Sequence, residues 1–459
     1  MQNKNSTPTV LGTADIRKLL IEYSGPAIVA MMASALYNII DRIFIGQGVS
    51  AYAISGLGVT MPVMNLSAAF GAMIGAGGAT LTSIKMGQQD YDSTQKVLGN
   101  VTLMNIVLGI IFMIVGLVYI DEILYFFGAS EKTIPYARDF MQVILAGNVI
   151  THLYLGLNSV MRSSGNPRKA MKITVMTVLI NLVLAPMFIF VFKWGIRGAA
   201  LSTIIAQFIA LMVVLHHFCK CDSFLQFKWS ALTFDLRICK SILSIGMAPF
   251  VLNACACLVV IIINKALFKH GGDLAIGAYG IVNSVLMIFM MLVMGVNQGM
   301  QPIAGYNFGA RLYSRVRKVL KLTIVFATVI TCLAFVIAQT IPGFLARMFT
   351  TDTELIDLTI IGLRVCCLAM PIVGFQMVTS NFFQSVGKAQ MAVVLSSSRQ
   401  LLLLIPLLLI LPNYFGMMGV FASMPLADSL ASIIAFFLLR REMKTFSKLE
   451  DHPMEVKKE

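Results

Sequence analysis

The stretch LLIEYSGPAIVAMMASALYNIIDRIFI, from Leu19 to Ile45, decides the fold class of this chain. It is continuous, apolar and long enough to cross a bilayer as a helix, for which about 20 residues suffice. It lacks the alternation of apolar and polar residues that a strand of a membrane barrel shows. Asp41 lies about twenty residues into it. We therefore expect a membrane-spanning helix that carries a carboxylate.

Similar stretches recur along all 459 residues, of which 58% are hydrophobic and only 12% are charged. A soluble domain carries about 25% charged residues. The pattern predicts an all-α membrane protein with twelve transmembrane helices near residues 20–46, 54–80, 97–120, 137–160, 170–192, 198–218, 241–268, 275–300, 318–342, 358–381, 391–412 and 418–440. The first 24 residues lack the pattern of a cleavable signal, so we expect the first span to be retained.

The net charge of +14 follows from the loops. About three-quarters of the 35 Lys and Arg residues fall on one side of the predicted membrane, together with both termini. This bias predicts that both termini are cytoplasmic, which requires an even number of spans. It also accounts for the basic composition through anionic lipids, without a nucleic acid.

The chain resembles itself at an offset of about 222 residues, which indicates a duplication. The matching positions include Gly58 and Gly280, Gly77 and Gly299, Tyr91 and Tyr313, Gly165 and Gly387, Gly195 and Gly416, and Asp41 and Asn264. Two halves of six spans each insert with the same orientation, so we expect two six-helix bundles related by a pseudo-two-fold axis along the membrane normal. The predicted divisions are an N-lobe over 1–217, a linker over 218–240, a C-lobe over 241–440 and a cytoplasmic tail over 441–459.

Asp41 is the strongest functional candidate, because a carboxylate within a span costs about 2.5–3.5 kcal/mol on insertion scales. The alternative is a structural role, in which Asp41 lies at the membrane interface and forms an ion pair with Arg42. Asp428 is the carboxylate inside the spans of the second half, where a functional role and a polar contact between packed helices stay equally open. We expect Arg399 to contact lipid or a loop on the cytoplasmic side.

A substrate cavity would be lined by soft and polar side chains from both halves. The candidates are Tyr37, Met61, Met64, Asn65, Asn264, Met287, Met291 and Gln298. For any single methionine, the favoured alternative is a side chain that faces lipid and has no role in substrate binding.

No motif indicates an enzyme or a cofactor. The eight cysteines show no disulfide pattern, and the group His216, His217, Cys219 and Cys221 does not have the spacing of a zinc site, so no metal is expected. There is no Walker-type phosphate loop, no His/Glu zinc motif and no serine nucleophile elbow. The composition and the duplication therefore favour a secondary transporter.

The ordered set of motifs resembles the MATE (multidrug and toxic compound extrusion) family, and most of all its bacterial MepA-like branch. The resemblance covers about residues 12 to 440. It is carried by Gly25-Pro26 through Asp41 to Gly46, by Ala53 to Leu57, by Met86-Gly87-Gln88, by Arg162 to Pro167 and by Gly198-Ala199-Ala200.

This resemblance implies a V-shaped pair of bundles in the bacterial cytoplasmic membrane that exports small organic cations in exchange for H⁺ or Na⁺, as a monomer. It also implies a cation-coupling site, whose matching positions are Asp41, Asn181, Ala185 and Thr203. Ala185 departs from the pattern, since many members carry an aspartate there. One carboxylate should hold sodium more weakly than two, which favours protons or an altered site. The acidic residue that some members carry in the seventh helix is also missing.

Two alternatives remain. A flippase for lipid-linked precursors, from a related fold, would need a cationic central cavity, and few Lys or Arg lie within the spans. No paired catalytic carboxylates or nucleophile–base set supports a membrane-embedded enzyme, and a receptor is hard to reconcile with the duplication.

Overall fold

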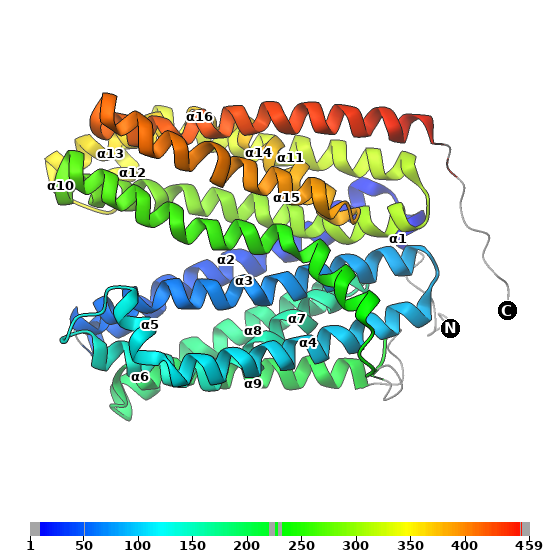
Figure 1. The fold of residues 1–459 in the computed structure, drawn as a ribbon, viewed down its shortest axis with the longest axis horizontal. Coiled ribbons are helices and arrows are strands. Elements are labelled where there is room, and N and C mark those ends of the chain that lie inside the picture. The colour runs from blue at the N-terminus through cyan, green and yellow to red at the C-terminus, as the bar shows by residue number, and fades with distance from the viewer. Residues whose placement is uncertain (1–9, 50, 220–224, 228–231, 450, 452–459) are drawn as a thin grey trace. The chain divides into compact units, whose positions relative to one another are not determined.

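The computed structural model describes residues 10–49, 51–219, 225–227, 232–449 and 451. Within these ranges the chain forms helices and loops, without a strand (Figure 1). The helices of the first half are α1 (Val10–Thr13), α2 (Ile16–Gly48), α3 (Ala51–Gly87), α4 (Tyr91–Val118), α5 (Ile120–Phe126), α6 (Ile134–Ala146), α7 (Asn148–Ser163), α8 (Pro167–Pro186), the π-helical η1 (Met187–Val191) and α9 (Gly195–Cys219). Those that follow are α10 (Leu236–Gly309), α11 (Tyr313–Thr340), α12 (Pro342–Arg347), α13 (Thr353–Cys366), α14 (Met370–Ser385), α15 (Ala389–Ser397), the π-helical η3 (Ser398–Leu404) and α16 (Ile405–Lys448).

The number of membrane spans agrees with the sequence. In the described part of the chain, nine helices are long and apolar enough to cross a membrane, and two bent pairs bring the number to eleven. One of the nine is the continuous stretch 389–448, which is broken at Gly416 by a φ of 56°. Counting its two arms separately gives twelve, so the predicted all-α, twelve-helix fold is confirmed.

The duplication is visible in the backbone. Gly165 and Gly387 both have positive φ, at 97° and 73°, and so do Gly195 and Gly416, at 58° and 56°. Gln89 and Arg311 share a φ of 58°, although neither is glycine. The fourth span of each half is also bent, by 54° between α6 and α7 and by 55° between α13 and α14. Loops and bends therefore repeat at the offset that the sequence shows.

The chain divides into two compact units, and each unit includes one helical segment from the other half of the sequence. Unit 1 comprises residues 1–13 and 29–250, and unit 2 comprises residues 14–28 and 251–459. Helix α2 therefore starts in unit 2 and continues into unit 1, whereas α10 starts in unit 1 and continues into unit 2. Nothing in the sequence pattern predicts this exchange.

Within unit 1, glycines let the start of α10 approach α3 closely. A Cβ on Gly77 would lie 2.1 Å from the carbonyl oxygen of Ile242, and a Cβ on Gly246 would lie 1.9 Å from that of Met73. Ile242 and Ile245 also belong to the same buried apolar cluster as Val97 of α4. The two helices therefore touch backbone to backbone.

Unit 2 repeats this arrangement with the start of α2. A Cβ on Gly299 would lie 2.2 Å from Ser24 Oγ, and a Cβ on Gly295 would lie 2.6 Å from Ile28. Ser24 Oγ also donates to the carbonyl oxygen of Val296. The exchange is thus built into both units by small residues at equivalent positions.

Polar contacts fix the beginning of α2 within unit 2. The Asp15 carboxylate accepts from the backbone N–H groups of Arg17 and Lys18 and pairs with Lys318 of α11 at 3.6 Å. The hydrogen bonds from Lys18 and Arg17 hold the pKa of Asp15 below its ordinary value. Arg315 Nη2 donates to the carbonyl oxygen of Ala14 at 2.6 Å. The segment is anchored before it enters the membrane.

The predicted lobe boundaries stay predictions. Residues 220–224 and 228–231 of the linker, and residues 450 and 452–459 of the tail, lie outside the described residues. Helix α16 continues to Lys448, so the beginning of the predicted tail is helical.

Candidate functional site

A polar cluster joins three helices of unit 1. Tyr37 of α2, Asn181 of α8 and Thr203 of α9 form a triangle whose three edges are all hydrogen bonds. Tyr37 Oη lies 2.9 Å from Thr203 Oγ1, and Asn181 Nδ2 donates to Tyr37 Oη at 3.2 Å and to Thr203 Oγ1 at 3.0 Å. The two predicted coupling residues Asn181 and Thr203 are therefore brought together, with Tyr37 as the third member.

Secondary contacts hold the Asn181 amide in one orientation. Ser202 Oγ donates to Asn181 Oδ1 at 3.3 Å, and Asn181 is only 3% exposed. Thr203 Oγ1 also reaches the carbonyl oxygen of Ala199 at 3.2 Å. The amide thus presents its nitrogen to the hydroxyls of Tyr37 and Thr203. A metal cation at this place would require the amide to turn, because only Oδ1 can ligate it.

Asp41 lies one helical turn beyond Tyr37 on the same face of α2, since residues four apart are neighbours. Its Oδ1 atom is buried. Ala185 holds the same position relative to Asn181 on α8 and is 1% exposed. Beside the triangle, α2 thus carries a carboxylate and α8 a buried methyl group.

The comparisons with known proteins agree with this architecture. A sequence model of the MatE family matches residues 26–187 and again residues 249–410, so each half of the chain carries one copy. The two matches together cover more than half of the chain.

The chain belongs to the MatE family.

Its relatives include the multidrug export protein MepA of Staphylococcus haemolyticus, which is 26% identical over 426 residues, 93% of this chain and 94% of the relative. MepA of Staphylococcus aureus is also 26% identical, over 92% and 93% of the two chains. These matches confirm the predicted resemblance to MATE transporters and to their MepA-like branch.

Solved MATE structures share the fold. The MATE multidrug transporter DinF-BH is 34% identical with a TM-score of 0.90, over 97% of this chain and 99% of that chain. An outward-facing multidrug resistance MATE transporter of the MOP superfamily has a TM-score of 0.91 at 22% identity, over 97% and 100% of the chains. The second likeness concerns the fold alone.

The residues predicted to line a substrate cavity are spread over both units of this MatE protein. Tyr37 belongs to the hydrogen-bonded triangle. The others lie on α3 or on α10: Met61, Met64 and Asn65 in unit 1, and Asn264, Met287, Met291 and Gln298 in unit 2. Met64 packs against the apolar core of unit 1 and its Sδ lies 3.9 Å from Thr60 Oγ1, whereas Met287 is 52% exposed. A shared cavity stays a prediction.

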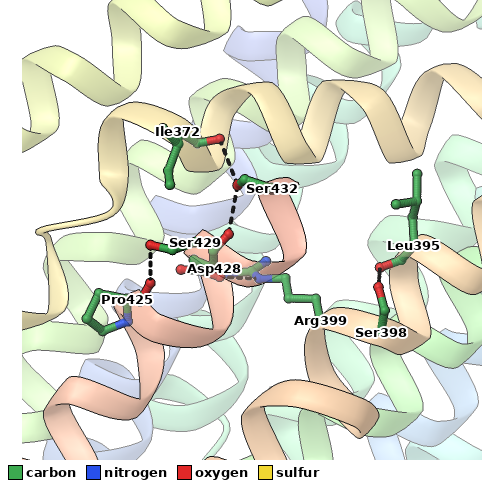
Figure 2. A network of polar contacts seen from close by, with 8 residues as sticks. All are labelled: Ile372, Leu395, Ser398, Arg399, Pro425, Asp428, Ser429 and Ser432. Atoms are coloured by element: carbon green, nitrogen blue, oxygen red, sulfur yellow. Dashed lines mark hydrogen bonds and ion pairs between the residues drawn. The ribbon is translucent and has the colours of Figure 1, made fainter. Parts of the chain in front are cut away.

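Unit 2 of this MatE protein holds an ion pair that sequence reasoning did not assemble. Arg399 Nε donates to Asp428 Oδ1 at 2.6 Å, and the two side chains are 21% and 12% exposed (Figure 2). Arg399 lies on the π-helical η3, and Asp428 lies on α16. The expectation that Arg399 contacts lipid or a loop was therefore wrong, because its guanidinium pairs with the carboxylate of Asp428 on a neighbouring helix. Ser432 Oγ continues the network to the carbonyl oxygens of Asp428 and Ile372.

Sequence reasoning also missed His152 of α7, which is 2% exposed and contacts Ser67 of α3. The available signal was the presence of a histidine inside a predicted span, where ionisable residues are rare. Of the group His216, His217, Cys219 and Cys221, Cys221 lies outside the described residues. Elsewhere in the described ranges, no three His, Cys, Asp or Glu residues are grouped to hold a metal.

Proposed function

We propose that this protein is a secondary antiporter that exports small organic cations, multidrug substrates among them, in exchange for an inorganic cation. The observation that carries the proposal is the triangle of Tyr37, Asn181 and Thr203 one turn from Asp41, in a chain of the MatE family. Relatives named as multidrug exporters support the substrate class. A transport role also accounts for a chain without recognisable catalytic motifs.

The carboxylate provides a physical basis for exchange. An organic cation and a proton both neutralise Asp41, so binding of one disfavours binding of the other. If the site opens to one side of the membrane at a time, this competition couples entry of the ion to exit of the substrate. Two six-span units would supply the two lobes that alternating access needs.

We propose the proton as the coupling ion, with sodium as the alternative. Sodium is held best by several oxygen ligands with net negative charge. The buried Ala185 contributes neither, and Asn181 turns its amide nitrogen toward the two hydroxyls. A proton needs only one acceptor, which Asp41 supplies.

The charge bias and the family support a proposal for the setting of the protein. We place the protein in the bacterial cytoplasmic membrane as a multi-pass monomer with both termini in the cytoplasm. Its partners are then its organic cation substrates and the surrounding lipids.

The ion pair of unit 2 speaks against a flippase for lipid-linked precursors. Such a cargo carries pyrophosphate and requires uncompensated positive charge inside the spans. Arg399 is neutralised by Asp428 at 2.6 Å. This arginine is therefore not available to a phosphate group.

The decisive experiment uses purified protein in proteoliposomes. We expect an imposed proton gradient to drive uptake of a fluorescent organic cation, and Asp41→Asn to abolish coupled uptake while the protein still folds. Asp357→Asn, which changes a carboxylate of α13 in the other unit, is the control. Parent-like coupled uptake in Asp41→Asn would remove Asp41 from the mechanism, and movement of a lipid-linked precursor instead of the cation would favour the flippase.

A further inference from the structure

A second polar cluster lies inside unit 1 and shares no residue with the Tyr37 triangle. Ser67 of α3 contacts Asn148 and His152 of α7: its Oγ donates to Asn148 Oδ1 at 2.9 Å and lies 3.0 Å from His152 Nε2. Asn148 and His152 are 3% and 2% exposed. Ser67 is near the middle of α3, about 24 Å of helix rise from its start and 30 Å from its end. The cluster is therefore deep within the membrane-spanning part of the unit.

Hydrogen-bond accounting assigns the protonation of His152. Ser67 has one hydroxyl proton, and it is used toward Asn148. Ser67 Oγ must then accept from His152, which places the imidazole proton on Nε2 and leaves the lone pair on Nδ1. His152 Nδ1 and Asn148 Nδ2 are buried and have no hydrogen-bond partner among the described residues. The cluster thus has an acceptor, His152 Nδ1, and a donor, Asn148 Nδ2, that are available for a further hydrogen bond.

The surroundings of Nδ1 are apolar and small. Gly71 of α3 faces it, and a Cβ added there would lie 3.5 Å from Nδ1. The Phe112 ring of α4 lies 6.2 Å from the imidazole, centroid to centroid. The neutral imidazole suits this environment, because an unsolvated imidazolium would be strongly disfavoured.

No charged residue of α3, α4 or α7 lies within nine positions along the chain of Ser67, Gly71, Phe112, Asn148 or His152; the nearest are Lys85, Lys96 and Arg162. Asp139 of α6 lies nine positions before Asn148, and Arg197 of α9 lines a hollow with Gly147 and Ile150 beside the α6–α7 break. The other charged residues within the neighbouring helices include Lys172 of α8 and Lys240 of α10. Tyr154 is the nearest other titratable side chain on α7, and its hydroxyl is directed to Thr174 and Thr177 of α8. Water is therefore the group that could solvate a charge at Nδ1.

The cluster adjoins a break in its helix. Asn148 is the first residue of α7, and the α6–α7 pair bends by 54° at Gly147. In transporters, broken helices place polar groups at ion and substrate sites near the middle of the membrane. A change of this bend would alter how water reaches Asn148 and His152.

We propose that His152 is a second proton-accepting residue of unit 1, which is neutral in the conformation described here and binds a proton at Nδ1 when the α6–α7 break admits water. The proton comes from water on one side and returns to water on the other, and no other bond is made or broken. His152 Nε2 continues to donate to Ser67 in both states. The inference rests on the proposed proton-coupled antiport and adds a site apart from Asp41.

The first test is ¹⁵N NMR of the histidine-labelled full chain in lipid nanodiscs, with His152→Gln to assign the signal. We expect the His152 signal to show a neutral, Nε2-protonated ring at the alkaline end and an imidazolium at the acidic end between about pH 5 and pH 8, where histidine titrates. A ring that stays neutral throughout, or that is charged throughout, overturns the proposal. This measurement needs no transport, so it stands even if the proposed antiport fails.

A matched pair of glycine variants tests the role of water. Gly71→Ala adds a methyl 3.5 Å from His152 Nδ1, and Gly75→Ala adds one on the same helix at the same 3.5 Å contact distance, against Gly156 and Ser159. We expect Gly71→Ala to move the His152 titration to lower pH and Gly75→Ala to leave it in place. Equal titrations in Gly71→Ala and the parent overturn the proposal.

The second test measures proton release during substrate transport in proteoliposomes. We expect His152→Gln to release fewer protons per substrate than the parent and to lose part of its pH dependence, with substrate affinity within about twofold. An unchanged proton count and pH profile overturn the role of His152. If the parent moves substrate without protons, the proposed coupling fails, and the NMR titration still decides whether His152 accepts a proton.

Discussion

The phenol oxygen of Tyr37 lies 2.9 Å from the hydroxyl oxygen of Thr203, although 166 residues separate them. The contact joins α2 to α9, and Asn181 of α8 closes the triangle. Three helices of unit 1 are therefore linked by side chains next to the proposed coupling carboxylate. A substitution at any of the three residues should therefore alter ion binding at Asp41.

Tyr37→Phe removes one oxygen and keeps the ring. We expect a loss of stability of about 1 kcal/mol, since each hydrogen bond contributes about 0.5–1.5 kcal/mol, and weaker coupling of substrate transport to the proton gradient. Thermal unfolding in detergent and gradient-driven uptake measure the two effects. Tyr119→Phe is the control, because Tyr119 is 55% exposed. Equal coupling in both variants would separate the Tyr37 hydroxyl from ion binding.

Ala185→Asp places a second carboxylate one turn from Asn181. We expect sodium to stimulate transport in this variant and to bind about tenfold more tightly or better, because ligand charge raises the affinity of oxygen sites for metal cations. Isothermal titration and sodium-dependent uptake at constant pH report the change. Ala185→Asn matches the size without the charge. Sodium stimulation of the same strength in Ala185→Asn would contradict the charge explanation.

The Arg399–Asp428 pair should respond more strongly to loss of one partner than to loss of both. A buried charge left without its partner costs about 3–5 kcal/mol, whereas an apolar replacement of both is often neutral. Arg399→Leu and Asp428→Leu should each lower the unfolding temperature, and the double variant should recover most of the loss. Additive losses in the double variant would show that the two side chains act independently.

Gly246→Ala tests the close approach of α10 to α3. The added methyl would lie 1.9 Å from the Met73 carbonyl oxygen, so backbone must shift at a cost of about 1–3 kcal/mol. We expect a lower unfolding temperature and a lower yield of folded protein. Gly58→Ala and Gly280→Ala are controls, since a Cβ at either position meets nothing within 4 Å. If Gly246→Ala unfolds at the same temperature as the parent, the close contact does not limit the stability of the unit.

The spans could be predicted because each is a long apolar run, and the duplication because loop glycines repeat at a constant offset. The bends at Gly147 and between α13 and α14 could not, because apolar composition continues through them. The same limit applies to α2 and α10. Their hydropathy does not change between residues 28 and 29 or between residues 250 and 251, where they pass from one unit to the other.

The site divides in a similar way. Asn181 and Thr203 were named through the family resemblance, and the structure places them within 3.0 Å. Tyr37 is predicted to line the substrate cavity, and its hydroxyl forms hydrogen bonds with Asn181 and Thr203. The sequence marks Arg399 and Asp428 as charged residues within spans but does not predict their ion pair. A contact between two different helices produces no periodic pattern in a single sequence.

The exchanged segments of α2 and α10 have a consequence for the origin of the chain. A gene for one half would encode a helix bundle whose glycine-lined groove lacks the segment that it receives from the other half. Two copies of such a product could satisfy each other by trading that segment. Fusion of the two genes would then preserve an exchange of helical segments that began in a homodimer. We therefore expect the two halves, expressed as separate polypeptides, to assemble only with each other and to be unstable alone.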